Sequence, residues 1–288
     1  LDDLKAIGER LLLFNKFDSA AVVFNKINEI ARKNGSDADL IYSLNRLSET
    51  YASVYEPDRA ETLAKEAIKL SDEKFGIQSI EHLVALNNLG NAHYLKGKHT
   101  EALAEFNKVM KQYNDLPEEK RIVLASPLNL GIGNVYYSKY QYREALNYFN
   151  HALQINIKSH GPTHPNVAYV YMSLGNLYRN MGSFSNAWEH YDKASKLLLS
   201  YFGEMHPAVA TSYIGLADLY ASGRQFDLAI QYYLRAQSIY EQFFKPQDPR
   251  FGDVYLGFGD VYKGEAEYEK AIENYQKALD IYMNSVGK

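Results

Sequence analysis

The chain has 288 residues, a formal net charge of −4 and no cysteine. Without cysteine it holds no disulfide and no thiolate metal site, which fits a reducing compartment, so we expect a cytoplasmic protein. The charge gives no strong basic field for a nucleic-acid backbone. No apolar run reaches the length of about 18 residues that predicts a membrane span.

Three residue columns recur along the chain in register. A small residue stands twelve positions before each alanine, and a ring residue stands nine positions before it in every copy but the first, which has Leu11. The alanines lie 40 to 43 residues apart at Ala20, Ala60, Ala102, Ala145, Ala187, Ala229 and Ala271. An aromatic residue follows each alanine by four positions in six of the seven copies, and Ala64 takes its place in the second. A fixed period of this size indicates stacked units with one continuous core. We therefore expect a single solenoid domain over 1–288, with repeats at approximately 1–40, 41–82, 83–125, 126–167, 168–209, 210–251 and 252–288.

Each repeat has the pattern of two helices joined by a short turn, as residues 83–112 illustrate. Leu86 and Leu89 lie at helical spacing, and Gly97 interrupts the pattern. Thr100 is expected to cap a second helix that contains Ala102. Small residues in both helices allow close approach, and the aromatic residues fill the space left between them.

These columns resemble the tetratricopeptide repeat, or TPR, over nearly the whole chain. Repeat five shows the match most fully, with Leu174-Gly175-x-x-Tyr178, Gly182-x-Phe184, Ala187-x-x-x-Tyr191 and Ala194. The resemblance implies an all-α fold, a right-handed TPR superhelix (α-solenoid) of seven helix–turn–helix repeats, with fourteen helices and no strand.

The period of about 42 residues exceeds the family's unit of about 34. We therefore expect the second helix of each pair to run longer than in that unit, as from Tyr142 to about Ser159. Gly161 suits the end of that helix, and Pro165 the start of the next. The junction Gly-x-x-His-Pro-x-Val-Ala occurs at 161–168 and again at 203–210. It resembles the kinesin-light-chain-like subclass of TPR proteins, and we expect its histidines to serve as caps and in turns.

One column is polar in all seven copies. It immediately follows the small residue of each first helix, and its members are Glu9, Glu49, Asn91, Asn134, Asn176, Asp218 and Asp260, here called the polar column. By resemblance, this position faces the concave groove, where an asparagine often bonds the backbone of an extended peptide. An amide offers one donor and one acceptor, which match one peptide unit. The same resemblance places Asn45, Arg46, Asn87, Asn88, Tyr137, Arg179 and Asn180 beside it.

The alternative is that the polar column is only a solvated inner face. Such faces normally mix lysine, serine and threonine, whereas this column contains only side chains with a carboxylate or amide oxygen. Its acidic ends favour a ligand with basic flanks. The predicted peptide-binding groove contains Glu49, Asn87, Asn88, Asn91, Asn134, Tyr137, Asn176, Arg179, Asn180, Asp218 and Asp260.

Motifs that carry chemistry are weak in this sequence. Gly131-Ile-Gly133 and Gly257-Phe-Gly259 look like pieces of phosphate loops, but each lies in a predicted first helix with no strand before it. No P-loop, His-Glu-x-x-His, calcium-binding loop or nucleophile elbow occurs. We therefore expect no catalysis, no cofactor and no metal.

The sequence favours a scaffold or adaptor that binds a protein or peptide, with no nucleic-acid or membrane partner. Two alternatives stay open. One is a peptide-sensing regulatory domain of a bacterial cytosolic signalling protein, and the other is the targeting module of a longer enzyme.

The seventh repeat carries a full set of packing residues, including Tyr262 and Tyr275, and its last helix is expected to end near Gly287. Part of this apolar surface should be bare, and bare apolar patches tend to find partners. The sequence thus predicts a following helix that covers the patch, or self-association through the uncapped C-terminal repeat.

Overall fold

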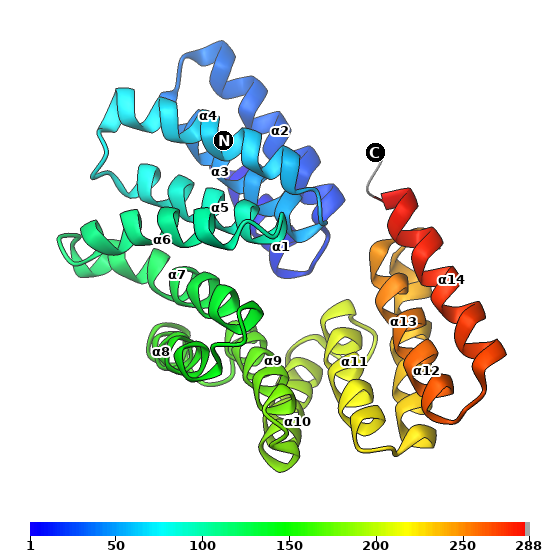
Figure 1. Ribbon diagram of the computed structural model, residues 1–288. Coiled ribbons are helices and arrows are strands. Elements are labelled where there is room, and N and C mark those ends of the chain that lie inside the picture. The colour runs from blue at the N-terminus through cyan, green and yellow to red at the C-terminus, as the bar shows by residue number, and fades with distance from the viewer. Residues whose placement is uncertain (286–288) are drawn as a thin grey trace. The chain divides into compact units, whose positions relative to one another are not determined.

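The computed structural model describes residues 1–285, and within them every element is a helix and none is a strand (Figure 1). The fourteen helices of this part of the chain are α1 (Asp2–Leu13), α2 (Phe17–Asn34), α3 (Asp37–Ser53), α4 (Pro57–Phe75), α5 (Ile80–Leu95), α6 (His99–Tyr113), α7 (Glu118–Ser138), α8 (Tyr142–His160), α9 (Pro165–Asn180), α10 (Phe184–Phe202), α11 (Pro207–Ser222), α12 (Phe226–Phe243), α13 (Pro249–Gly264) and α14 (Tyr268–Ser285). The predicted number and class of elements are confirmed.

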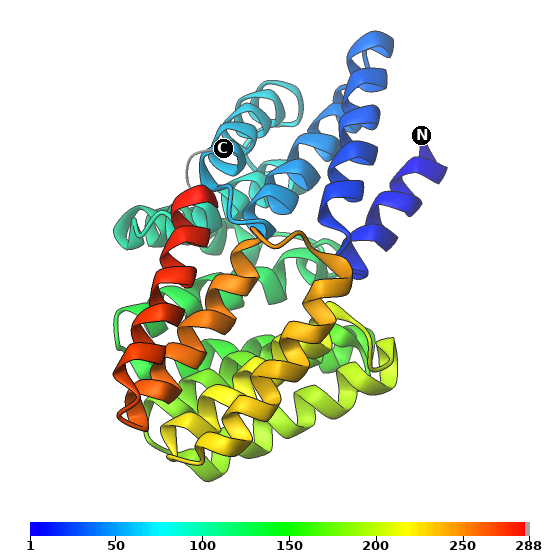
Figure 2. The ribbon, with the colours of Figure 1, turned by 90° about the vertical axis from the view of Figure 1, so that its right-hand side faces the viewer.

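The chain divides into two compact units, Leu1–Ile155 and Asn156–Lys288. Unit 1 contains the hairpins α1–α2, α3–α4 and α5–α6, whose helices contact each other in pairs. Unit 2 contains the hairpins α9–α10, α11–α12 and α13–α14, and both views show the last two helices side by side (Figures 1 and 2). One domain over 1–288 stays a prediction.

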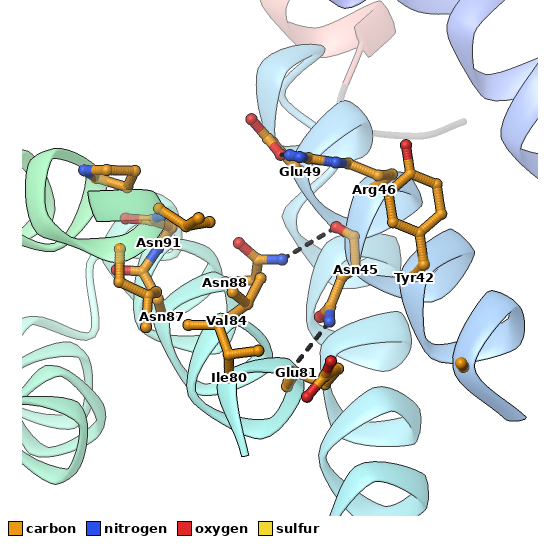
Figure 3. A pocket seen from close by; sticks show the side chains of 14 residues that line it. Tyr42, Asn45, Arg46, Glu49, Ile80, Glu81, Val84, Asn87, Asn88 and Asn91 are labelled. Atoms are coloured by element: carbon orange, nitrogen blue, oxygen red, sulfur yellow. Dashed lines mark hydrogen bonds and ion pairs between the residues drawn. The ribbon is translucent and has the colours of Figure 1, made fainter. Parts of the chain in front are cut away.

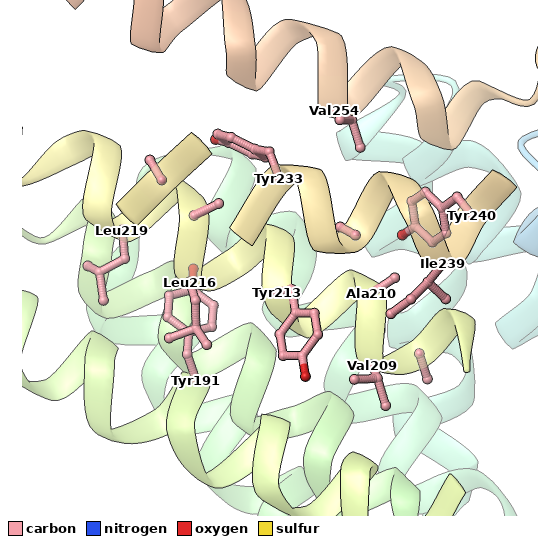
Figure 4. Close-up of a cluster of buried hydrophobic side chains, with 14 of the residues drawn as sticks. Tyr191, Val209, Ala210, Tyr213, Leu216, Leu219, Tyr233, Ile239, Tyr240 and Val254 are labelled. Carbon is pink, nitrogen blue, oxygen red and sulfur yellow. The ribbon is translucent and has the colours of Figure 1, made fainter. Parts of the chain in front are cut away.

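Small and large residues interlock between repeats as the sequence predicts. A Cβ atom on Gly175 would lie 2.8 Å from Cδ1 of Tyr191, and one on Gly215 would lie 2.5 Å from Cε1 of the same ring. The ring of Tyr191 therefore fits only because glycine stands on both α9 and α11. Ala187 is fully buried, as predicted. Figure 4 shows Tyr191 in the unit 2 core with Leu216, Tyr213 and Tyr233.

The two histidine–proline junctions are caps, as predicted. Nδ1 of His164 accepts a hydrogen bond from the backbone N–H of Asn166 at 3.2 Å, and His206 does the same for Ala208 at 3.2 Å. The following prolines are the first residues of α9 and α11. Gly161 has a φ of 86°, a left-handed conformation that suits glycine after a helix.

One local expectation is wrong. Thr100 does not cap α6, because the left-handed Gly97 (φ 71°) reverses the chain so tightly that the helix already begins at His99. The long second helix expected in repeat four is confirmed, since α8 runs from Tyr142 to His160. The first helix before it, α7, is also long, because it begins directly after Pro117, which stands at its N-cap.

The seventh repeat leaves part of its apolar surface bare, as expected. Tyr262 and Tyr275 are half-buried, and the Lys270 ammonium lies 5.3 Å from the centre of the Tyr262 ring. The most exposed apolar residues of this repeat lie along α14, at Tyr268, Ile272, Leu279 and Met283. Gly287, where the last helix was expected to end, lies outside the described residues.

Candidate functional site

The polar column lies on the seven first helices, from α1 to α13. In three repeats of unit 2 its side chain accepts a hydrogen bond from a tyrosine hydroxyl on the second helix of the same repeat. The pairs are Tyr191 with Asn176 at 2.5 Å, Tyr233 with Asp218 at 2.6 Å, and Tyr275 with Asp260 at 2.7 Å. The rings of Tyr191 and Tyr275 pack against Gly175 and Gly259, the small residues that precede their acceptors, so these hydroxyls emerge next to the polar column.

Asn91 and Asn134 lack this partner. The corresponding rings are Phe106 and Phe149, which have no hydroxyl group. Both asparagines are half-buried, and within the described residues neither side chain takes part in a hydrogen bond. Their amides are therefore the members of the polar column in unit 1 that are left for a ligand.

The first two members of the polar column are held by one arginine. Nε of Arg46 lies 2.7 Å from Glu9, and its Nη1 lies 2.7 Å from Glu49. The hydroxyl of Tyr42 donates to Glu9 at 2.5 Å. Burial and the carboxylate of Glu9 raise the pKa of Tyr42, so its hydroxyl keeps the proton that it donates. This cluster fixes α1 against α3.

Beside this cluster, α3, α5 and α7 enclose a cavity of about 270 Å³, here called the first cavity (Figure 3). Its apolar wall contains Ile80, Val84, Val123, Leu124 and Pro127. Its polar lining contains Tyr42, Asn45, Arg46, Glu49, Glu81, Asn87, Asn88 and Asn91. Four predicted groove residues thus meet here, and the apolar wall is a part of the site that the sequence analysis missed.

Two asparagines of the first cavity join α3 to α5. Nδ2 of Asn88 donates to the backbone carbonyl of Asn45 at 3.0 Å, and Nδ2 of Asn45 donates to that of Glu81 at 3.2 Å (Figure 3). Asn87 makes no such link: it is only 3 % exposed, and its Oδ1 has no hydrogen-bond partner, as is also true of Oδ1 of Asn45. A buried amide without partners is costly, so Asn87 marks a place where a ligand could improve the hydrogen bonding.

A second cavity of about 230 Å³ adjoins the first one. It shares Glu49, Asn88 and Asn91 with the first cavity. Asn134 from α7 and Tyr94 from α5 also line it. The structure therefore brings together five predicted groove residues in unit 1, namely Glu49, Asn87, Asn88, Asn91 and Asn134.

The other predicted residues do not line these two cavities. Tyr137 packs against Tyr142, with ring centres 6.2 Å apart. In unit 2, Arg179 lies 3.3 Å from Asp218, while Asn180 is exposed. Burial raises the pKa of Asp218 above its usual value, although Arg179 opposes the shift.

Within residues 1–285, no group of three or more histidine or acidic side chains is placed to hold a metal ion. No described helix is long and apolar enough to cross a membrane. The site instead offers amides, carboxylates and an apolar wall, which are means of binding.

A stack of helical hairpins that presents cavities between neighbouring repeats defines the class of α-solenoid interaction scaffolds. Residues 39–115, 123–198, 170–242 and 221–284 match the family model described as Tetratricopeptide repeat. These matches cover well over half of the chain, which therefore belongs to the tetratricopeptide repeat family. A search of curated proteins found no match.

Solved structures with the same fold include three of different origin. A Rap protein complexed with Competence and Sporulation Factor is 16% identical over 97% of this chain and 74% of that chain, with a TM-score of 0.75. BtubC (BKLC) from P. vanneervenii is 18% identical over 81% and 93%, with a TM-score of 0.59. Kinesin light chain TPR-like repeats from Podosopora anserina are 18% identical over 70% and 95%, with a TM-score of 0.52. The kinesin-light-chain-like resemblance is thus confirmed at the level of the fold.

Proposed function

We propose that this protein is a non-catalytic scaffold that binds an extended peptide segment of a partner on the face of unit 1 formed by α3, α5 and α7. The observation that carries the proposal is the pair of unbonded amides, Asn91 and Asn134, at the edge of two adjoining cavities. An amide bonds both the N–H and the carbonyl of one peptide unit. Such contacts give affinity that does not depend on the ligand's sequence.

Unit 2 offers fewer polar groups for ligand binding than unit 1. Tyrosine hydroxyls bond Asn176, Asp218 and Asp260, so these residues already have a structural role. In Asn176 and Asp260, one of the two polar side-chain atoms takes no part in the bond to tyrosine, and Asn180 is exposed. Ligand contacts from this unit are therefore proposed as additions to those of unit 1.

The charges around the first cavity favour a partner with basic residues. Glu49 and Glu81 line the first cavity, and Glu9 lies beside it on Arg46. Three carboxylates against one guanidinium leave an acidic surround, which attracts basic flanks and repels a nucleic-acid backbone. The partner is accordingly proposed to be a protein or peptide.

This function can be tested with peptides selected for binding from a phage-displayed library of random seven-residue sequences. Asn91→Ala with Asn134→Ala should weaken binding of the selected peptides about 10- to 100-fold, since each lost bond to a peptide unit costs about 1 kcal/mol or more. Asn107→Ala with Asn150→Ala is the matched control, because it makes the same change at exposed positions on α6 and α8 of the same two repeats. Equal affinity of both double variants would refute the proposal.

A second candidate is a peptide-sensing domain of a signalling protein. It is favoured by the similarity to a Rap protein solved in complex with Competence and Sporulation Factor. In a sensor, the peptide must change the affinity for another partner. A pulldown with and without a selected peptide distinguishes the two functions. In a plain scaffold the peptide displaces only partners that bind the same face, whereas in a sensor it also changes the binding of another partner. A targeting module of a longer enzyme would bind in the same way as the scaffold.

A further inference from the structure

The two cavities of unit 1 form a trough along α5. The first cavity contacts α5 from Ile80 to Asn91, and the second from Asn88 to Leu95. The lining residues of α3, from Ala38 to Ser53, and those of α7 also pass from the first cavity to the second as the residue number rises. The long axis of the trough is therefore parallel to the three first helices α3, α5 and α7, whereas a ligand that followed the polar column would cross these helices.

The length of the trough limits what it can hold. Ile80 and Leu95 are 15 residues apart, which corresponds to about 22 Å of helix. An extended chain spans about 3.3 to 3.6 Å per residue. The trough thus matches a segment of about six residues.

The two ends of the trough have different chemistry. Val84, Val123 and Pro127 form an apolar wall at the first cavity. Its volume of about 270 Å³ exceeds the roughly 150 Å³ that already admits a benzene-sized group in an apolar cavity. Ser48, Ser53 and Asn134 line the second cavity. The first cavity therefore suits an aliphatic side chain of the ligand, and the second cavity suits a polar stretch of the ligand's chain.

Asn87 lines the first cavity, about midway along α5. Its Oδ1 has no hydrogen-bond partner within the described residues although the residue is buried. The outermost torsion of an asparagine side chain is soft, so its amide can turn toward a ligand. A backbone N–H above it would provide the missing donor.

We propose that this trough binds a segment of about six residues that runs along α5, with one aliphatic side chain in the first cavity and a basic residue next to it. The basic residue is placed by Glu81 and Glu49, which flank the first cavity. This inference rests on the proposed function and adds to it the direction of the ligand and the kind of side chain that it must carry.

The test uses the same displayed heptapeptide library on the whole chain. The selected peptides should share one Leu, Ile, Val or Met and lack an acidic neighbour to it. Val123→Asp should weaken their binding at least tenfold, because it puts a carboxylate on the apolar wall. Val22→Asp is the matched control, since it makes the same change at an exposed valine on α2, and it should leave affinity within twofold. Both valines are more than half exposed, so both variants should fold.

The direction is tested with Ser53→Trp, which fills the second cavity. A peptide shortened at the end farthest from its aliphatic residue should bind the unmodified chain more weakly than the full peptide does. In Ser53→Trp the second cavity is already filled, so the same shortening should not weaken binding further. Equal binding to Val123→Asp and Val22→Asp, or a truncation effect that Ser53→Trp leaves intact, would overturn this inference while the proposed function stands. Selected peptides that bind the Asn91→Ala, Asn134→Ala double variant normally would instead overturn the proposed function.

Discussion

The hydroxyl of Tyr191 donates a 2.5 Å hydrogen bond to Oδ1 of Asn176, fifteen residues earlier in the chain. The ring reaches it because Gly175 and Gly215 leave room on α9 and α11. The same relationship recurs between Tyr233 and Asp218. The polar column therefore serves structure in unit 2 and leaves amides unbonded in unit 1.

The first prediction separates these two roles. Asn176→Ala removes the acceptor of a buried tyrosine hydroxyl and should lower the free energy of unfolding by about 1–3 kcal/mol. Asn134→Ala breaks no hydrogen bond and should change it by less than about 0.5 kcal/mol. Urea unfolding of both variants measures the difference, and equal midpoints would contradict the assignment of separate roles.

The second prediction concerns pH. Burial raises the pKa of Asp218 above 3.8, with Asp260 adding to the shift and Arg179 and Tyr233 opposing it. A raised carboxyl pKa means that the folded state holds the proton more tightly, so stability is lost as pH rises from 3.8 through the folded value. Asp218→Asn keeps an acceptor for Tyr233 and removes this loss.

The Asn variant should therefore be more stable than the unmodified chain at pH 7, and its advantage should shrink as pH falls through the raised pKa of Asp218 toward 3.8. Thermal unfolding across that range measures it. An advantage that is independent of pH would show that the Asp218 carboxylate is not the cause.

The helical hairpins could be predicted from the sequence because their period depends on residue type alone. Gly175, Ala187 and Tyr191 show where helices approach and where a ring fills the gap. The choice of tyrosine or phenylalanine at the ring position also distinguishes Asn176 from Asn91, although only the structure shows that the hydroxyl meets the polar column.

The first cavity could not be predicted in the same way. Its apolar wall combines Val84 from α5 with Val123 and Pro127 from α7, the first helix of the next hairpin. A repeat pattern gives the face on which a residue lies but not the space between helices of different repeats. Pro117 starts α7 early, and because this start does not follow the repeat period, the period could not predict it.

The third prediction tests whether Asn87 is kept for binding. Asn87→Leu replaces a buried amide without hydrogen-bond partners by an apolar side chain of similar size. Stability should stay the same or rise, by up to about 1–3 kcal/mol, while affinity for the selected peptides falls.

Asn156→Leu is the control for this change. Asn156 is 1% exposed and donates to the backbone carbonyl of Asn166 at 3.2 Å. Its replacement leaves that carbonyl without the donor and should destabilise the protein by about 1–3 kcal/mol. If Asn87→Leu were destabilising to the same degree, Asn87 would be a structural residue.

The fourth prediction concerns the exposed apolar residues of α14. Tyr268, Ile272, Leu279 and Met283 are each more than half exposed and recur at helical spacing. We expect this apolar stripe to support self-association, so that the sedimentation coefficient rises with concentration. Ile272→Lys with Leu279→Lys should abolish the rise, and Val22→Lys on α2 should not. A chain that stays monomeric at high concentration would contradict this expectation.

The most direct test of the account is a map of peptide contacts by NMR, with the side-chain amides of the asparagines as probes. A selected heptapeptide is titrated into the chain, and the amide signals of Asn91 and Asn134 are compared with those of Asn107 and Asn150. Binding of the peptide to this face of unit 1 should give saturable shifts for Asn91, Asn134 and Asn87, with Asn107 and Asn150 unchanged. Shifts confined to Asn107 and Asn150, on the second helices, would place the ligand elsewhere and contradict the account.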